Sequence, residues 1–167
     1  MTLNEIFFPG GKQHILRLKS TTMEASVKEM VDALQHSNRL KTETAPVALK
    51  ALLDREQVSS TGIGNGIAIP HARTDAIPEI VGLVAVSKAG VEFHSIDGQP
   101  VHVALLVLSP RSGSKGSLTT VLPKDPKDSP AAHLNTLAEI ARYVRTEKFQ
   151  DFMRRVKEDD SNFPDFA

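Results

Sequence analysis

Two apolar segments constrain the fold of this 167-residue chain more than any other feature. Val81 to Val86 and Val101 to Leu108 are largely apolar at consecutive positions, so both faces of each extended segment should be buried. This pattern is typical of strands in a sheet that helices cover on both sides. The segments therefore predict central strands. A tight turn is expected at Asp97-Gly98 between them, and a short strand from about His14 to Lys19.

Four segments with helical spacing of apolar residues supply the expected covering layers. We predict helices from Glu24 to about Asn38 and from Ala45 to Glu56, the second capped by Thr44. A third helix is predicted to begin at Pro130, capped by Ser129, and a fourth to span Glu147 to Lys157. The inward-facing stripes are predicted to be Val27, Met30, Val31 and Leu34; Ala45, Ala48, Leu49, Leu52 and Leu53; Leu134, Leu137, Ala138 and Ala141; and Phe149, Phe152, Met153 and Val156.

The length and the 40% hydrophobic content favour one substantial core, so residues 1–167 are predicted to form a single domain. Within it, residues 111–131 are rich in proline, glycine and serine and lack apolar periodicity, which indicates an exposed insertion. Residues 158–167 follow the last helical stripe and are expected to form a frayed tail.

Charge and composition narrow the classes of function. Lys plus Arg equals Asp plus Glu at 20 each, so no net field favours nucleic acid, and any anion must be bound locally. Cysteine is absent, which removes disulfides, thiolate metal sites and cysteine nucleophiles. Since no segment approaches the ~20 apolar residues of a membrane span, and no signal-peptide pattern is present, we expect a cytoplasmic protein without direct membrane insertion.

One group of neighbouring residues, from Ser59 to His71, indicates a chemical function. The segment from Ser59 to Gly66 has three glycines in five positions, which predicts a loop rather than a helix or strand. It leads into the apolar Ile67 to Ile69, a predicted strand that Pro70 ends because proline has no N–H for the ladder. His71 is then expected just past the strand's end. A neutral imidazole is a competent nucleophile there, and loop N–H groups can cradle phosphate oxygens. The pattern predicts reversible phosphoryl transfer to His71.

Two further residues are candidates to stabilise such a transfer. Arg55 ends the second predicted helix, and its guanidinium suits phosphate. His133 shares a helix face with Leu137, Ile140 and Val144, so it should point inward. The alternatives are structural: Arg55 as a helix C-terminal charge paired with Asp54 or Glu56, and His133 as a satisfied core histidine. Additional phosphate contacts are predicted at Ser60, Thr61, Gly62 and Gly64. The alternative is that Ser60 and Thr61 only satisfy backbone groups of the loop and that the glycines only serve its turns.

The sequence lacks the motifs that bind other classes of ligand. The three glycines do not form a dinucleotide fingerprint, because the spacing fails and the order is helix, loop, strand. A Walker phosphate loop is absent as well. His94 and His102 have no close ligand partner of the kind that zinc sites use. We therefore expect neither a metal nor an organic cofactor, because fixed protein donors can stabilise phosphoryl transfer instead.

The run from Arg55-Glu56 through Ser60 to Ala72 resembles the active-site signature of a known family, the type-2 enzyme IIA domains of the phosphoenolpyruvate-dependent sugar phosphotransferase system. The segments Ile96 to Val101 and Ala132 to Leu137 resemble further elements of that family, so the resemblance spans nearly the whole chain. It implies an α/β fold in which a mixed β-sheet lies between helical layers.

The same resemblance implies a phosphotransferase component with a phosphohistidine intermediate on His71, with Arg55 and His133 facing the phosphate. The donor would be the histidine phosphocarrier protein HPr or its nitrogen-branch paralogue, and the acceptor a IIB domain. The alternative is a nitrogen-regulatory enzyme IIA, a binding module whose phosphorylation state controls a target protein. Residues 72–76 favour fructose-type members. A member that binds partners without phosphorylation is a third possibility, against which the presence of all three site residues argues.

Overall fold

The sheet at the centre of the molecule determines where every other element lies. The computed structural model describes residues 2–111 and 130–158, and within them six strands form one mixed sheet in the order β1-β5-β6-β3-β2, with β4 also paired to β6. The strands are β1 (Ile15–Arg17), β2 (Gly62–Gly64), β3 (Ile67–Ala68), β4 (His71–Thr74), β5 (Val81–Val91) and β6 (Val101–Pro110).

The two long central strands, β5 and β6, are those that the apolar segments predicted. They pair antiparallel, while β1 runs parallel to β5 and both β3 and β4 run parallel to β6. The predicted turn at Asp97-Gly98 is present: Gly98 has a φ of 70°, and its N–H donates to the Ser95 carbonyl at 2.9 Å. The strand predicted near residues 14–19 is also confirmed, as the shorter β1.

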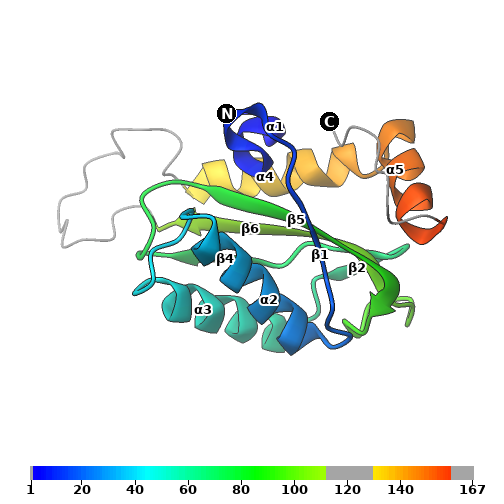
Figure 1. Cartoon of the computed structure of the whole chain (residues 1–167), viewed down its shortest axis with the longest axis horizontal. Helices are drawn as coiled ribbons and strands as arrows, with labels where there is room; N and C mark the ends of the chain where they lie inside the picture. Colours follow the sequence, from blue (N-terminus) through cyan, green and yellow to red (C-terminus); the bar gives the residue numbers. More distant parts are fainter. Residues whose placement is uncertain (1, 112–129, 159–167) are drawn as a thin grey trace.

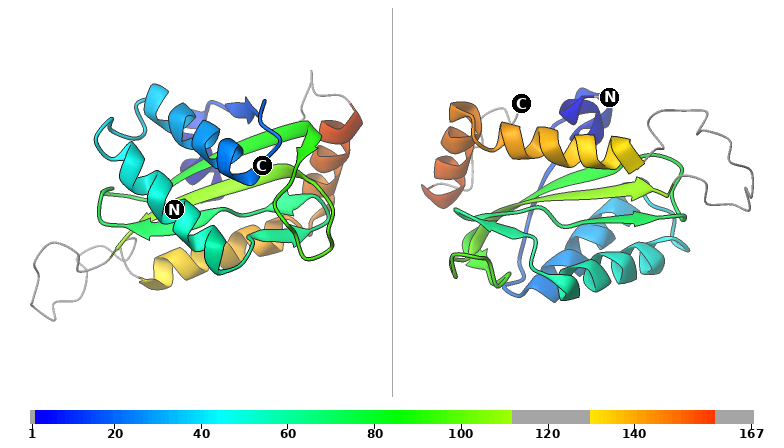
Figure 2. Two further views of the ribbon diagram at one scale, coloured as in Figure 1. Left: turned by 90° about the horizontal axis from the view of Figure 1, so that it is seen from below. Right: turned by 180° about the vertical axis from the view of Figure 1, so that it is seen from behind.

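Helices cover both faces of the sheet (Figure 1). One layer contains α2 and α3, and the other contains α1, α4 and α5, as two further views show (Figure 2). This arrangement confirms the single-domain α/β/α fold. The helical segments are α1 (Leu3–Phe7), the 3₁₀ turn η1 (Pro9–Gly11), α2 (Met23–His36), α3 (Ala45–Val58), α4 (Pro130–Tyr143) and α5 (Glu147–Glu158).

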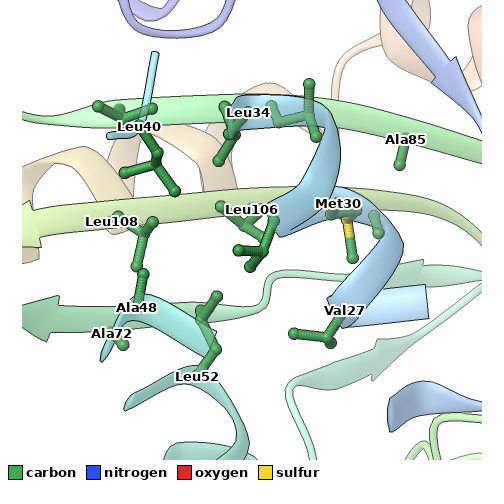
Figure 3. Packing of buried hydrophobic residues seen from close by; sticks show 14 of the residues in the cluster. Val27, Met30, Leu34, Leu40, Ala48, Leu52, Ala72, Ala85, Leu106 and Leu108 are labelled. Carbon is green, nitrogen blue, oxygen red and sulfur yellow. The ribbon is translucent and has the colours of Figure 1, made fainter. Parts of the chain in front are cut away.

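Alternate residues of β6 enter two separate cores, which explains why the segment is apolar at nearly every position. Leu106 and Leu108 pack against α2 and α3 (Figure 3), whereas Leu105 and Val107 pack against α4 and α5. All four side chains are fully buried. The site described below lies at the end of β6, so both cores hold it in place.

One predicted helix stripe is wrong in part, because Leu137 packs against the core as predicted but two of its other members do not. In α4, Leu134 is 64% exposed and Ala138 is also exposed, whereas His133, Ile140 and Val144 are buried. Ile140 and Val144 pack in the core with residues of β5 and β6, and this contact sets the rotation of the helix and leaves Leu134 outside. The inward orientation predicted for His133 is confirmed.

The glycine-rich segment also differs from its prediction. Gly62–Gly64 forms β2, which pairs antiparallel with β3 through a turn at Asn65-Gly66, where φ is 56° and 80°. Glycine and asparagine tolerate these positive φ values, so the same residues that indicated a loop build a hairpin.

Three predictions fall on residues that the structure does not describe, or describes only in part. The N-cap at Ser129, most of the insertion predicted at residues 111–131 and the tail predicted at residues 158–167 lie outside the two described ranges. In those ranges, no helix has the length and apolar character needed to cross a membrane.

Candidate functional site

β4 positions His71, and it does so differently from the prediction. The chain does not leave the sheet at Pro70: the Pro70 carbonyl accepts the Val107 N–H at 2.9 Å, and His71 pairs with Val107 as the first residue of β4. Proline has no N–H to donate but its carbonyl still accepts, so the pairing with β6 is interrupted at Ile69 and Pro70 and resumes at His71. His71 therefore lies on a strand of the sheet, which fixes its backbone.

A neighbouring backbone carbonyl holds the His71 ring in place. Its Nδ1 lies 2.7 Å from the Ile69 carbonyl oxygen, and because a carbonyl only accepts, Nδ1 carries the proton. Partial burial lowers the pKa of His71; the Ile69 bond opposes that shift, and the positive charge of Arg55 adds to it. The ring is thus neutral at pH 7, and Nε2 keeps its lone pair.

A second imidazole lies beside the first. The ring centroids of His71 and His133 are 5.6 Å apart, and His133 is 6% exposed in the first turn of α4. Its Nδ1 is 2.6 Å from the Ser109 hydroxyl. Burial lowers the pKa of His133 to about 4, with further lowering from His71 and from the charge of Arg73. Both rings are therefore uncharged at neutral pH.

Both histidines open onto a cleft of about 780 Å³ at the edge of the sheet, between α3 and β4. Its basic side chains, Lys50, Arg55, Arg73 and Arg111, outnumber its two carboxylates, and one of these, Asp54, is bound to Lys50 at 2.6 Å. The complete lining is Val47, Lys50, Ala51, Asp54, Arg55, His71, Ala72, Arg73, Thr74, Asp75, Ala76, Arg111 and His133. A chain without net charge thus concentrates positive charge beside its two histidines.

Arg55 reaches this cleft from the last turn of α3, which ends at Val58, two residues beyond the predicted end at Glu56. Its Nη1 donates to the Ser59 carbonyl at 2.9 Å. Neither neighbouring carboxylate takes the pairing considered in the structural alternative, since Asp54 binds Lys50 and Glu56 accepts from the backbone and hydroxyl of Thr61. The structure therefore brings together Arg55, His71 and His133.

The other four predicted residues are not part of the cleft lining. The Ser60 hydroxyl donates to the Phe93 carbonyl at 2.5 Å and accepts from the Gly62 N–H, and Thr61 is bound to Glu56. A Cβ at Gly62 would meet Ser95, and one at Gly64 would approach Asp97. Ser60 and Thr61 lie between α3 and β2, whereas Gly62 and Gly64 are part of β2. A phosphate contact by any of the four stays a prediction.

The sequence patterns did not predict some residues that line the cleft or support it. Arg73 lines the cleft and follows His71 by two positions on the same strand. Ser109 is outside the cleft lining but lies opposite Arg73 on β6, and both relations depend on the presence of β4. Val47, Lys50, Ala51, Asp54 and Arg55 have the spacing of a single helix face, a signal that the sequence does contain. Within the described ranges, no group of three or more His, Asp or Glu side chains could hold a metal ion.

Comparison with known proteins identifies the family. The model of the phosphoenolpyruvate-dependent sugar phosphotransferase system, EIIA 2, matches residues 11–124, a range that includes Arg55 and His71. The chain belongs to this family. The match ends before His133, so the second histidine of the cleft rests on the structure and on the motif around it.

Individual relatives of this type-2 enzyme IIA chain carry two kinds of name. A nitrogen regulatory protein of Bradyrhizobium diazoefficiens is 33% identical over 105 residues, which are 63% of this chain and 56% of that protein. The fructose-specific EIIABC component of Bacillus subtilis is 30% identical over 146 residues, 87% of this chain but 20% of that protein. The chain thus spans about half or less of the length of these curated relatives.

Solved structures share the fold. The Escherichia coli complex of enzyme IIA mannitol and phosphorylated enzyme IIB mannitol matches with a TM-score of 0.62 and 16% identity, over 90% of this chain and 91% of that one. At this identity the likeness establishes the α/β/α architecture.

Proposed function

We propose that this chain is a phosphocarrier of the sugar phosphotransferase system that accepts a phosphoryl group on His71. The observation that carries the proposal is the Ile69 carbonyl, which fixes the proton on Nδ1 of His71 and leaves Nε2 as the nucleophile in a cationic cleft. The donor is HPr or its nitrogen-branch paralogue, and residues 1–167 act as one domain in the cytoplasm. The family membership supports the class of reaction.

The transfer balances without a metal or an external base. The Nε2 lone pair of His71 attacks phosphorus while the bond between phosphorus and the donor's nitrogen breaks, and its electron pair leaves with the donor imidazole. The Nδ1 proton of His71 stays in place, and the Ile69 oxygen stabilises the positive charge that develops on the ring. Transfer to an acceptor is the same step in reverse.

Arg55 and His133 stabilise the negative phosphoryl oxygens in this scheme. Arg55 supplies a permanent charge from α3. Neutral His133 supplies a donor from Nε2, provided that the Ser109 hydroxyl donates to its Nδ1. Such fixed donors act most strongly in sites from which water is partly excluded.

A IIB domain is our proposed acceptor, and the complex of enzyme IIA with phosphorylated enzyme IIB supports this choice through its shared fold. The alternative is a regulatory protein whose phosphorylation changes what it binds, supported by the relative named nitrogen regulatory protein. Both proposals require a phosphohistidine at His71 and differ only in the acceptor.

The test is incubation with phosphoenolpyruvate, enzyme I and HPr, followed by intact mass measurement. We expect one acid-labile phosphoryl group in the native protein, none in His71→Ala, and slow labelling of a correctly folded Arg55→Ala. His94→Ala is the matched control, because the His94 side chain is 84% exposed and lies outside the cleft lining. Full labelling of His71→Ala would defeat the assignment.

A further inference from the structure

Arg73 directly follows the sequence motif and lies on the same strand as His71. His71 and Arg73 are both half-buried on β4, whereas Ala72 and Thr74 between and after them are buried. Side chains of a strand alternate between its faces, so His71 and Arg73 point to the same side, about 7 Å apart along the strand. An arginine side chain spans that distance.

The strand register connects Arg73 to the second histidine. Arg73 pairs with Ser109 on β6, and Ser109 is the residue whose hydroxyl lies 2.6 Å from Nδ1 of His133. Arg73, Ser109 and His133 are therefore neighbours on the α4 side of the sheet. The charge of Arg73 contributes to the low pKa of His133, whereas Arg55 acts in the same way on His71.

The Arg73 guanidinium has a free donor with which it can bind an anion. Its Nε is buried and has no hydrogen-bond partner among residues 2–111 and 130–158, and none of the ion pairs found in those ranges includes Arg73. A buried N–H without an acceptor is unfavourable, and a phosphoryl oxygen within reach would relieve that penalty. Arg73 also lines the same cleft as His71.

We propose that Arg73 is a second phosphoryl-binding arginine, which contacts the phosphoryl group on His71 from the side of His133 while Arg55 contacts it from α3. The inference rests on the proposed function, because it names a further contact in the same site. Two guanidinium groups supply donors to more than one oxygen of the group, and these donors are fixed by a strand and a helix of the same rigid fold.

A kinetic experiment tests this contact. Rates of labelling by HPr and of phosphohistidine hydrolysis are measured for the native protein, Arg73→Gln, Arg73→Lys and the control Arg142→Gln, an exposed arginine of α4 outside the cleft lining. We expect Arg73→Gln to slow labelling roughly tenfold to a hundredfold, Arg73→Lys to recover part of the loss, and Arg142→Gln to match the native protein. Equal labelling and hydrolysis rates in Arg73→Gln and the native protein would overturn the inference.

A spectroscopic measurement removes the dependence on how the variants fold. In the native protein, the side-chain Nε–H resonance of Arg73 should move when HPr labels the chain, and it should stay unchanged under the same conditions in His71→Gln. A resonance that does not move in the labelled native protein would also overturn the inference. If the native protein takes up no phosphoryl group, the proposed function fails first, and that result is distinct from an unaffected Arg73.

Discussion

The two histidines of the cleft differ in what holds their Nδ1 atoms, and this difference sets their chemistry. A carbonyl oxygen fixes the His71 proton on Nδ1, whereas a hydroxyl, which can donate or accept, faces Nδ1 of His133. The first ring is thereby prepared as a nucleophile, and the second is able to act as a donor from Nε2.

The low pKa of His133 predicts a dependence of stability on pH. Above pH 6.5 the ring is neutral in both states, but between pH 6.5 and about 4 the unfolded chain binds a proton that the folded chain does not. Stability should therefore fall as the pH falls through this window. We expect His133→Gln to remove on the order of 1 to 2 kcal/mol of that loss, allowing for solvent screening.

Urea unfolding of the native protein and His133→Gln at pH 7.5, 5.5 and 4.5 measures this effect. His71 contributes a loss of the same sign, because its pKa is also lowered, so part of the pH dependence should persist in the variant. Identical pH dependence in the two proteins would show that His133 titrates normally in the folded state.

Sequence patterns predicted some site residues and not others for a physical reason. His71, Arg55 and His133 stand at recognisable local signals: a Pro-His pair after a short apolar segment, the end of a predicted helix and an inward helix face. Arg73 and Ser109 become site residues only through the pairing of β4 with β6, a contact between segments 36 residues apart that local periodicity does not encode.

The β2–β3 hairpin is the element in which glycine spacing has the clearest structural reason. A Cβ at Gly62 would lie 2.1 Å from Oγ and 2.9 Å from Cβ of Ser95. The hairpin and Ser95, the first residue of the turn that contains Asp97-Gly98, are therefore too close for a side chain at position 62. Local composition indicated only a loop at residues 59–66, because Ser95, the residue that leaves no room for a side chain at position 62, is distant in the sequence.

Gly62→Ala should therefore destabilise the protein by about 1 to 3 kcal/mol through overpacking. Shortening the opposing side chain with Ser95→Gly in the same molecule should recover part of the loss, since the Ser95 hydroxyl has no hydrogen-bond partner among the described residues. Chemical denaturation of the two single variants and the double variant measures the coupling. Additive effects of the two substitutions would contradict the proposed steric contact.

The sheet joins two cores into one unit, because β6 contributes alternate residues to each. The apolar segments predicted this double burial, but the pairing of β3 and β4 with β6 came from the structure, since strand order depends on contacts between distant segments. A cleft at the end of β6 should therefore lose its geometry when either core is weakened.

Substitutions in the two cores should act on a single unfolding transition. Leu106→Ala, on the side of α2 and α3, and Phe152→Ala, on the side of α5, each remove a fully buried side chain and should cost about 2 to 5 kcal/mol. Val58→Ala, at an 81% exposed position, should change stability by less than about 0.5 kcal/mol. Two separate transitions in either core variant would show that the layers unfold independently.

The central point of the proposed mechanism is which nitrogen of His71 bears the phosphoryl group. The chain, labelled with ¹⁵N in its histidine rings and phosphorylated through HPr, reports the modified nitrogen by NMR correlation between ring protons and nitrogens. With Nδ1 bound to the Ile69 carbonyl, we predict phosphorus on Nε2 of His71 and unmodified nitrogens in His133. Phosphorus on Nδ1 of His71, or on either nitrogen of His133, would contradict the mechanism.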